Sequence, residues 1–172
     1  ILNTLAVIAM ATRVGLSWDR IKAGIETFEG VKRRQEIIGE CRGVVVIDDF
    51  AHHPTAIHET LSAIRLHYPD RRIWAIFEPR SATSRQKVFQ AEFARSFGAA
   101  DWTVIADLFA KEKIPAENRL DLSRLVRDLE LAGKRGKFIP TVDEIVEQIG
   151  PRLKSGDLVC ILSSGGFGGL HQ

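Results

Sequence analysis

Along the chain, short apolar runs typical of strands alternate with longer stretches in which apolar residues have the three- and four-residue spacing of helices. Six short runs rich in β-branched and aromatic residues end in turn residues and predict strands. These strands are expected at residues 35–41, 44–49, 72–77, 102–106, 136–139 and 158–162. Between them, apolar residues at three- and four-residue spacing predict helices, at residues 54–64, 88–97, 122–129 and 142–149. Strands that alternate with helices in this way predict an α/β fold, a Rossmann-like and mainly parallel sheet with helices on both faces.

The first part of the chain is predicted to be helical and to lie outside this fold. One helical segment ends near Gly15, and a second runs from Ser17 to Gly30 before the first strand. We therefore expect residues 1–30 to be the helical end of a preceding domain and residues 31–172 to form the α/β domain. Since residue 1 is not methionine, we also expect further sequence on the N-terminal side.

Composition narrows the classes of protein. The chain has 172 residues, 45% of them hydrophobic, which is enough for one core. Its net charge of +2 gives no reason to expect a nucleic acid or a membrane as a partner. Cys41 and Cys160 lie in or beside predicted strands without CxxC spacing, and we expect buried free thiols in a protein of the reducing cytoplasm, with a disulfide as the alternative.

The candidate chemistry is concentrated where the strand 44–49 ends, because ligands of open α/β sheets bind outside the carboxyl ends of the strands. Asp48 and Asp49 are adjacent on extended backbone, so their side chains point to opposite faces and cannot form a paired-carboxylate dyad. One of them is expected to accept hydrogen bonds from ribose hydroxyls, and a loop or helix cap is the alternative. His52 and His53 are poorly placed to bind one metal together, so a single ligand, a substrate hydrogen bond and a structural role stay open.

Three further features place positive charge or glycine near strand ends. The basic run 32–34 suits phosphate oxygens, or is a solvated turn. Arg80, restrained by Pro79, could bind a substrate carboxylate through two parallel hydrogen bonds. The glycine-rich loop 163–169 could present backbone N–H groups to an anion, although it matches neither the nucleotide P-loop nor the dinucleotide fingerprint. Any cradle for a triphosphate is therefore expected on sequence outside this chain.

Taken together, these motifs resemble one family. Residues 28–36 (FEGVKRRQE) and 48–55 (DDFAHHPT) resemble the C-terminal domain of the Mur ligases, the ATP-dependent amide-forming enzymes of peptidoglycan synthesis. Residues 77–81 (FEPRS) and 164–171 (SGGFGGLH) resemble the branch that joins UDP-N-acetylmuramate to the murein tripeptide L-Ala-γ-D-Glu-meso-diaminopimelate in peptidoglycan recycling. The branch that adds L-alanine shares the aspartate-histidine-proline motif but typically has a histidine-arginine pair where this chain has Arg80-Ser81.

The resemblance implies roles for individual residues. Asn3 is implied to approach the adenine of ATP, Arg34 its phosphates and Asp49 its ribose. His52 is implied to be the catalytic residue near the amine of the acceptor substrate. The remaining implied residues follow strand ends and face the acceptor; they are Phe50, His53, Arg80, Ser81, Ser163 and Ser164.

The resemblance also implies a reaction. The muramyl carboxylate attacks the γ-phosphate of ATP, which gives an acyl phosphate and releases ADP. The amine of the acceptor then displaces phosphate from the acyl phosphate, with Mg²⁺ neutralising charge on the transferring phosphoryl group. ATP and Mg²⁺ are implied to be bound mainly by N-terminal and central domains outside this chain, so no metal ligand is expected within it and the fragment alone is expected to be inactive. Residues 30–34 are the expected hinge.

Three other classes of protein fit some of these motifs. The first is a UDP-N-acetylmuramate–L-alanine ligase domain of the same family. The second is a noncatalytic α/β module that binds a nucleotide or an acidic peptide. A dinucleotide oxidoreductase domain is disfavoured, because no glycine-rich turn follows the first strand.

Overall fold

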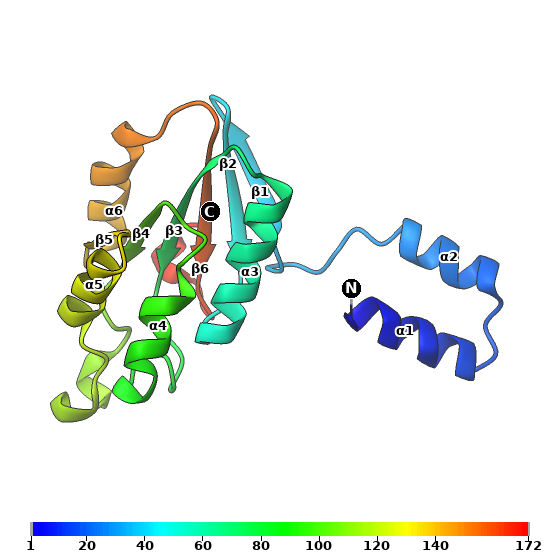
Figure 1. Ribbon diagram of the computed structural model, residues 1–172, viewed down its shortest axis with the longest axis horizontal. Coiled ribbons are helices and arrows are strands. Elements are labelled where there is room, and N and C mark those ends of the chain that lie inside the picture. Colours follow the sequence, from blue (N-terminus) through cyan, green and yellow to red (C-terminus); the bar gives the residue numbers. More distant parts are fainter. Residues whose placement is uncertain (1, 172) are drawn as a thin grey trace. The chain divides into compact units, whose positions relative to one another are not determined.

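The structure is a computed structural model that describes residues 2–171. The chain divides into two compact units, Ile1–Val31 and Lys32–Gln172 (Figure 1). No helix in the described range is long and apolar enough to cross a membrane.

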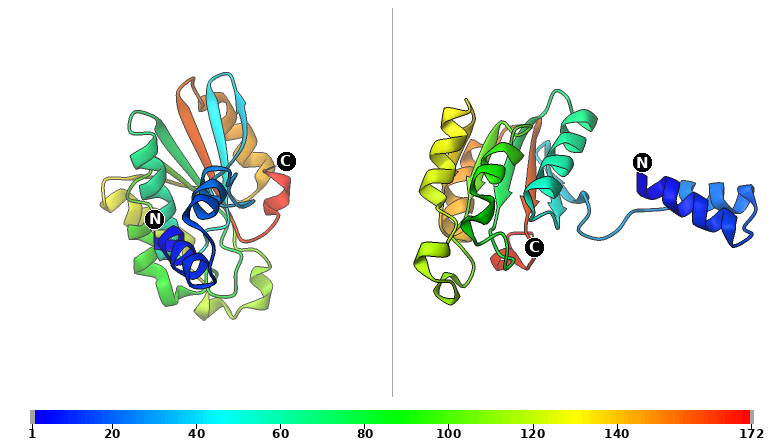
Figure 2. Two further views of the ribbon diagram at one scale, coloured as in Figure 1. Left: turned by 90° about the vertical axis from the view of Figure 1, so that its right-hand side faces the viewer. Right: turned by 60° about the horizontal axis from the view of Figure 1, so that its bottom comes forward.

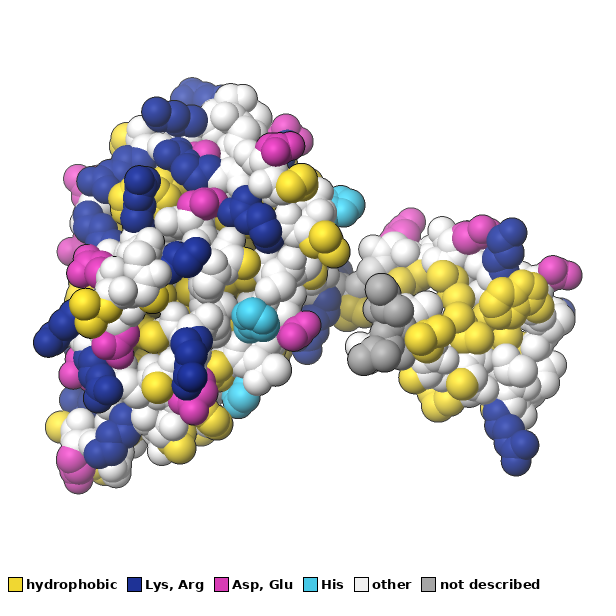
Figure 3. All heavy atoms as spheres, in the orientation of Figure 1, with side chains coloured by type: hydrophobic (Ala, Val, Ile, Leu, Met, Phe, Trp, Pro, Cys, Tyr) yellow, Lys and Arg dark blue, Asp and Glu magenta, His cyan; other side chains and the backbone are white. Residues whose placement is uncertain are grey.

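The first unit is a pair of helices, α1 (Leu2–Arg13) and α2 (Trp18–Glu26). They are joined through Gly15, whose φ of 85° is the left-handed conformation expected of a helix terminator. Ser17 has the extended backbone of an N-cap, but its side chain makes no capping hydrogen bond. Only Ile21 is buried among the described apolar side chains of this unit, and an apolar patch is visible on its surface in Figure 3. Two short helices therefore leave most of their apolar surface without a core.

The second unit is built on a six-stranded sheet with the order β1-β2-β6-β3-β4-β5 (Figures 1 and 2). The strands are β1 (Glu36–Cys41), β2 (Val44–Asp49), β3 (Arg72–Phe77), β4 (Trp102–Ile105), β5 (Arg135–Phe138) and β6 (Asp157–Leu162). The last five run parallel, and β1 is antiparallel to β2. The hairpin between β1 and β2 turns through Arg42 and Gly43, both with positive φ, as a type I′ turn requires.

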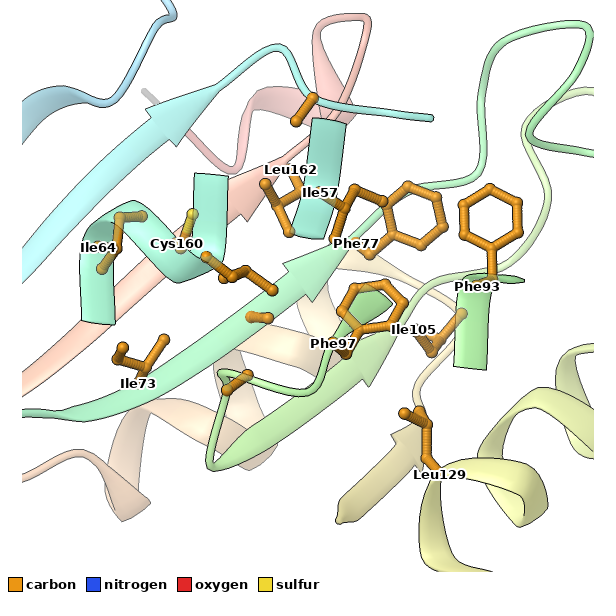
Figure 4. Packing of buried hydrophobic residues seen from close by; sticks show 14 of the residues in the cluster. Ile57, Ile64, Ile73, Phe77, Phe93, Phe97, Ile105, Leu129, Cys160 and Leu162 are labelled. Carbon is orange, nitrogen blue, oxygen red and sulfur yellow. The ribbon is translucent and has the colours of Figure 1, made fainter. Parts of the chain in front are cut away.

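Helices cover both faces of the sheet, as the sequence predicts. One face packs against three helices, α3 (Pro54–His67), α4 (Gln90–Ser96) and α5 (Leu122–Leu131). Figure 4 shows this core, where Ile57 of α3 and Phe93 of α4 approach Phe77 of β3. The other face packs against α6 (Val142–Ile149) and the turn around Phe167. The α/β fold with helices on both faces is thus confirmed.

The strand register brings three carboxyl ends to the same level. Leu162, the last residue of β6, pairs with Asp49 of β2 on one side and with Phe77 of β3 on the other. The loops that follow β2, β6 and β3 therefore start beside one another, although they are far apart in the sequence. The last strand in the sequence lies between the first two parallel strands, which is the kind of switch point where open α/β sheets bind ligands.

Some details differ from the sequence prediction. The helix expected at residues 88–97 begins as a 3₁₀ turn and becomes α-helical only at Gln90. α2 ends at Glu26 rather than at Gly30. The segment 107–121, which sequence patterns left undefined, contains two short 3₁₀ turns and buries Leu108, Ile114 and Leu120. Cys160 is a buried free thiol as expected, but the prediction of burial is wrong for Cys41, which is exposed at the end of the edge strand β1.

Candidate functional site

Asp48 and Asp49 point to opposite faces of β2, as their spacing predicts. Asp49 shares the face of α3, where its Oδ1 accepts a hydrogen bond from the Thr60 hydroxyl at 3.4 Å. Asp48 accepts a hydrogen bond on Oδ2 from Nε of Arg33 at 2.8 Å. Both carboxylates are almost completely buried, with 2% and 3% of their surface exposed. The two acids therefore have separate partners and separate tasks.

Asp49 organises the loops around it. Its Oδ1 accepts a hydrogen bond from the N–H of Ala51 at 2.7 Å, and its Oδ2 accepts one from the N–H of Gln35 at 2.9 Å. These bonds hold the end of β2 to the segment before β1. In this conformation the loop-cap role left open by the sequence is the one that the hydrogen bonds fulfil.

Arg33, which sequence reasoning treated only as part of a basic run, connects two of the three strand ends. Besides its bond to Asp48, its Nη2 donates to the carbonyl oxygens of Ser163 at 2.8 Å and Gly165 at 2.9 Å. Its backbone oxygen accepts a hydrogen bond from Phe50 at 2.8 Å. Arg33 has a φ of 58° and Gln35 a φ of 49°, so two non-glycine residues adopt the left-handed conformation. The surrounding hydrogen bonds hold this strained turn in place.

Arg34 is exposed and makes no hydrogen bond among the described residues, in contrast to Arg33. Its guanidinium carbon lies 5.3 Å from the ring centre of Phe50, and that of Arg33 lies 5.5 Å from the same ring. Both distances fall within the range of cation–π attraction. Phe50 thus holds a guanidinium with unused donors beside the end of β2.

The two adjacent histidines use their Nδ1 atoms in opposite ways. Nδ1 of His52 lies 2.9 Å from the carbonyl oxygen of Phe50, which can only accept a hydrogen bond. Neutral His52 therefore carries its proton on Nδ1, and Nε2 is the acceptor. Nδ1 of His53 instead accepts a hydrogen bond from the N–H of Thr55 at 3.3 Å and caps α3. His52 thus has a basic nitrogen available, whereas the Nδ1 of His53 serves the fold.

Arg80 and its neighbours form a second cluster beyond β3. Glu78 is buried, and its Oε2 accepts a hydrogen bond from the Ser163 hydroxyl at 2.5 Å. Its Oε1 lies 3.4 Å from Nη1 of Arg80. The guanidinium of Arg80 stacks on Phe109, with Cζ 3.6 Å from the ring centre. The loops after β3 and β6 are thereby joined through Glu78 and Ser163.

The other predicted site residues have different surroundings. Ser81 caps a local turn by accepting a hydrogen bond from the N–H of Ser84 at 3.0 Å. Ser163 is fully buried in the Glu78 cluster, whereas Ser164 is partly exposed. Asn3 is exposed on α1, in the other compact unit. Its predicted proximity to Arg34 and Asp49 therefore stays a prediction.

A shallow pocket of about 380 Å³ lies beside the site, between α3 and α4. Among the predicted site residues it includes only His53, and its walls also contain His58, Phe89 and Arg95. Arg34, Asp49 and Arg80 do not line it. Arg34 and Arg80 are instead connected through the contacts of Phe50, Arg33 and Gly165, and Asp49 adjoins this series of contacts through the N–H of Gln35.

Sequence reasoning missed several residues that build the site. Arg33 has no role of its own in the sequence analysis, which assigns only Arg34 to a phosphate. Glu78 is part of the motif 77–81, but nothing in the sequence indicates that it is buried and bonded to Ser163. Nothing in the sequence indicated a role for Phe109, because it lies in the segment 107–121, which has no regular pattern of apolar residues. Within the described range there is no group of three or more acidic, histidine or cysteine side chains that could hold a metal ion.

A glycine-rich loop, an imidazole with an acceptor nitrogen and two arginines near a switch point are typical of a ligand-binding α/β domain, and comparison with known proteins places it in a family. The sequence model described as "Mur ligase, glutamate ligase domain" matches residues 33–165. The chain therefore belongs to the Mur ligase family, as the C-terminal domain of such enzymes.

Individual relatives extend this finding. UDP-N-acetylmuramate–L-alanine ligase of Desulfitobacterium hafniense is 39% identical over 96% of this chain and 36% of its own length. The crystal structure of a murein peptide ligase from Psychrobacter arcticus is 37% identical with a TM-score of 0.73, over 99% of this chain and 35% of that one. UDP-N-acetylmuramate–alanine ligase of Thermotoga maritima has a TM-score of 0.80 at 23% identity, over 99% and 35% of the two chains, which shows the shared fold. The chain spans about a third of the length of these relatives.

Proposed function

We propose that this chain is the C-terminal domain of an ATP-dependent ligase that forms an amide between the carboxylate of UDP-N-acetylmuramate and the free amine of an L-alanyl acceptor. The observation that supports this most is the network in which Arg33 bridges Asp48 and the Gly165 carbonyl. This network joins the ends of β2 and β6, and the bond between Ser163 and Glu78 joins the loop after β3 to them, with His52 and Arg80 on these loops. Membership of the Mur ligase family supplies the reaction class.

Each residue has a role that its surroundings allow. The acceptor amine must be neutral to attack, and we assign its proton to Nε2 of His52 as a general base; the hydrogen bond of Nδ1 to the Phe50 carbonyl, which makes Nε2 the acceptor nitrogen, supports this role. Arg80, with most of its donors unused, binds a carboxylate of the acceptor. Positioning of the amine is the main contribution of such a domain to the rate.

Three residues of this chain are assigned to ATP. Arg34 has free donors for phosphate oxygens, which suits this role. Asp49 already accepts three hydrogen bonds, so contact with the ribose uses its remaining lone pair or displaces the Gln35 N–H. Asn3 approaches the adenine. We assign the unit Ile1–Val31, whose apolar surface lacks a core, to the end of a central ATPase domain.

Magnesium is assigned to other domains, because the described part of this chain offers no suitable cluster of ligands. When bound there, the ion neutralises charge on the transferring phosphoryl group.

The identity of the acceptor has two candidates. Curated relatives at 32–40% identity are described as UDP-N-acetylmuramate–L-alanine ligases, and they support L-alanine better than a peptide. Both candidates offer the same chemistry, the α-amine of an L-alanyl residue and a carboxylate beyond it.

The murein tripeptide is the second candidate, and two observations favour it. Arg80-Ser81 stands where the L-alanine branch typically has a histidine-arginine pair. The Psychrobacter arcticus structure, described as a murein peptide ligase, is 37% identical. A stacked arginine on the loop after β3 suits a carboxylate at the far end of an extended acceptor.

The test is a phosphate-release assay on the full-length protein with ATP, Mg²⁺ and UDP-N-acetylmuramate. We expect release that depends on L-alanine or on the tripeptide, and the ratio of kcat/KM for the two acceptors identifies the substrate. Nucleotide binding without any acceptor-dependent release would instead support a noncatalytic binding module.

A further inference from the structure

Arg80 is held mainly by an aromatic ring, beside one long hydrogen bond to Glu78 at 3.4 Å. Its guanidinium carbon lies 3.6 Å from the ring centre of Phe109, whereas the other arginine–aromatic pairs of the described residues are 5.0–5.6 Å apart. At 3.6 Å the guanidinium is in van der Waals contact with the ring face. The plane of Arg80 is therefore set by Phe109.

Gly165 is also packed against Arg80. A Cβ built on Gly165 would overlap Nε and Cδ of Arg80. Gly165 has no positive φ, so its backbone conformation is open to other residues. The absence of a side chain at Gly165 thus serves the placement of Arg80, and the arginine is confined by both Phe109 and Gly165.

Phe109 is itself fixed in the 107–121 segment. Its N–H donates to the carbonyl oxygen of Pro79 at 3.1 Å, and its own carbonyl oxygen accepts a hydrogen bond from Nη1 of Arg85 at 2.9 Å. The ring is nevertheless 43% exposed and belongs to neither hydrophobic core. A half-exposed phenylalanine adds little to the hydrophobic core. Because hydrogen bonds fix its backbone N–H and carbonyl oxygen, its ring has a fixed position against which Arg80 packs.

The confined guanidinium keeps most of its hydrogen-bonding capacity. Among the described residues its only hydrogen-bond partner is Glu78, at 3.4 Å, and Glu78 is tied through its other oxygen to Ser163. A guanidinium has five N–H donors in a planar fork that matches a carboxylate. Because the plane of Arg80 is already set, a carboxylate can bind without ordering the side chain first.

We propose that Phe109 is a positioning residue for Arg80 and, through it, a determinant of affinity for the acceptor carboxylate. The inference rests on the proposed ligase function and holds for both candidate acceptors, since each carries a carboxylate. It gives the 107–121 segment a role in substrate recognition.

The test uses the full-length enzyme and the acceptor that it turns over. Phe109→Leu keeps an apolar side chain but removes the aromatic face, and we expect the KM for the acceptor to rise about 3- to 10-fold. We expect kcat and the KM for ATP to change by less than about twofold, because the ring contacts neither reacting group. Phe109→Tyr should behave as wild type.

Phe138→Leu is the matched control, because Phe138 is 40% exposed on β5 and no arginine stacks on it. An acceptor with its terminal carboxylate amidated is the second control, and Phe109→Leu should leave its KM unchanged. If the wild-type enzyme turns over the acceptor and Phe109→Leu has the same KM for it, the inference about Phe109 is wrong, while the proposed function stands. Absence of wild-type turnover with either acceptor would overturn the proposed function and the inference with it.

Discussion

Nε of Arg33 lies 2.8 Å from Oδ2 of Asp48, and this ion pair fastens the first residues of the second unit to the end of β2. The carboxylate of Asp48 is buried, and its Oδ1 has no hydrogen-bond partner among the described residues. Arg33 is therefore the main compensation for a buried charge.

Replacing Arg33 should destabilise the domain more than replacing its neighbour. In Arg33→Met, Asp48 is left buried and unpaired, and two carbonyl oxygens lose their donor. We expect a loss of about 2–4 kcal/mol in the free energy of unfolding. Arg34→Met, which removes an exposed guanidinium, should cost less than about 0.5 kcal/mol. Urea denaturation of both variants measures the difference, and equal losses would show that Arg33 has no special role.

Asp49→Ala should affect both stability and nucleotide binding. The variant loses the acceptor for the N–H groups of Gln35 and Ala51, so we expect the domain to be destabilised by about 1–3 kcal/mol. If Asp49 also contacts the ribose, the full-length variant should bind ATP more weakly under conditions where it is fully folded. Calorimetric titration measures this, and a wild-type affinity for ATP would leave Asp49 with the structural role only.

The two cysteines should differ in reactivity. Burial raises the pKa of the Cys160 thiol well above its ordinary value, and the charges of Asp49 and Asp48 add to the shift. The thiolate is the reactive form, so Cys160 should be inert in the folded protein. Cys41 is exposed. A thiol reagent should label one cysteine in the native chain and the second only after unfolding; rapid labelling of both would contradict the fold around β6.

The lowered pKa of Asp157 makes the free energy of unfolding depend on pH. Burial of Asp157 opposes its ionisation, but hydrogen bonds from Arg72 and from the N–H of Lys154 outweigh burial and lower its pKa. A lowered pKa in the folded state stabilises the protein above the unfolded pKa of about 3.9, and this contribution is lost as the pH falls through the folded value. We therefore expect wild type to lose stability steeply below about pH 4. Asp157→Asn should be less stable at neutral pH and should show a flatter pH dependence in denaturant unfolding.

The sequence predicts the sheet and the helices on its two faces well, because the apolar residues that each element buries recur with the period of that element. Strands such as Val44–Asp49 are apolar on both faces, and Thr141 with Glu144 forms the capping box at α6 that their spacing indicates. The exceptions are segments without a period. In 107–121, isolated apolar residues such as Ile114 and Leu120 are buried through tertiary contacts that local patterns do not encode.

The site was only partly predictable for a related reason. The sequence directs attention to the loop after β2 and to Arg80, because ligands of open α/β sheets bind at the carboxyl ends of strands. It did not show that Arg33 points inward while Arg34 is exposed, since the strained turn that holds them depends on Asp48 and on carbonyls about 130 residues away. The tautomers of His52 and His53 likewise depend on backbone partners that only the folded structure supplies.

The most direct test of the whole account is a crossed kinetic comparison of Arg34→Met and Arg80→Met in the full-length enzyme. We predict that Arg34→Met raises the KM for ATP and leaves that for the acceptor unchanged, while Arg80→Met does the reverse. Roughly tenfold effects are expected for a lost charge-assisted contact. Wild-type values of both constants in both variants would contradict the placement of the active centre at this edge of the sheet.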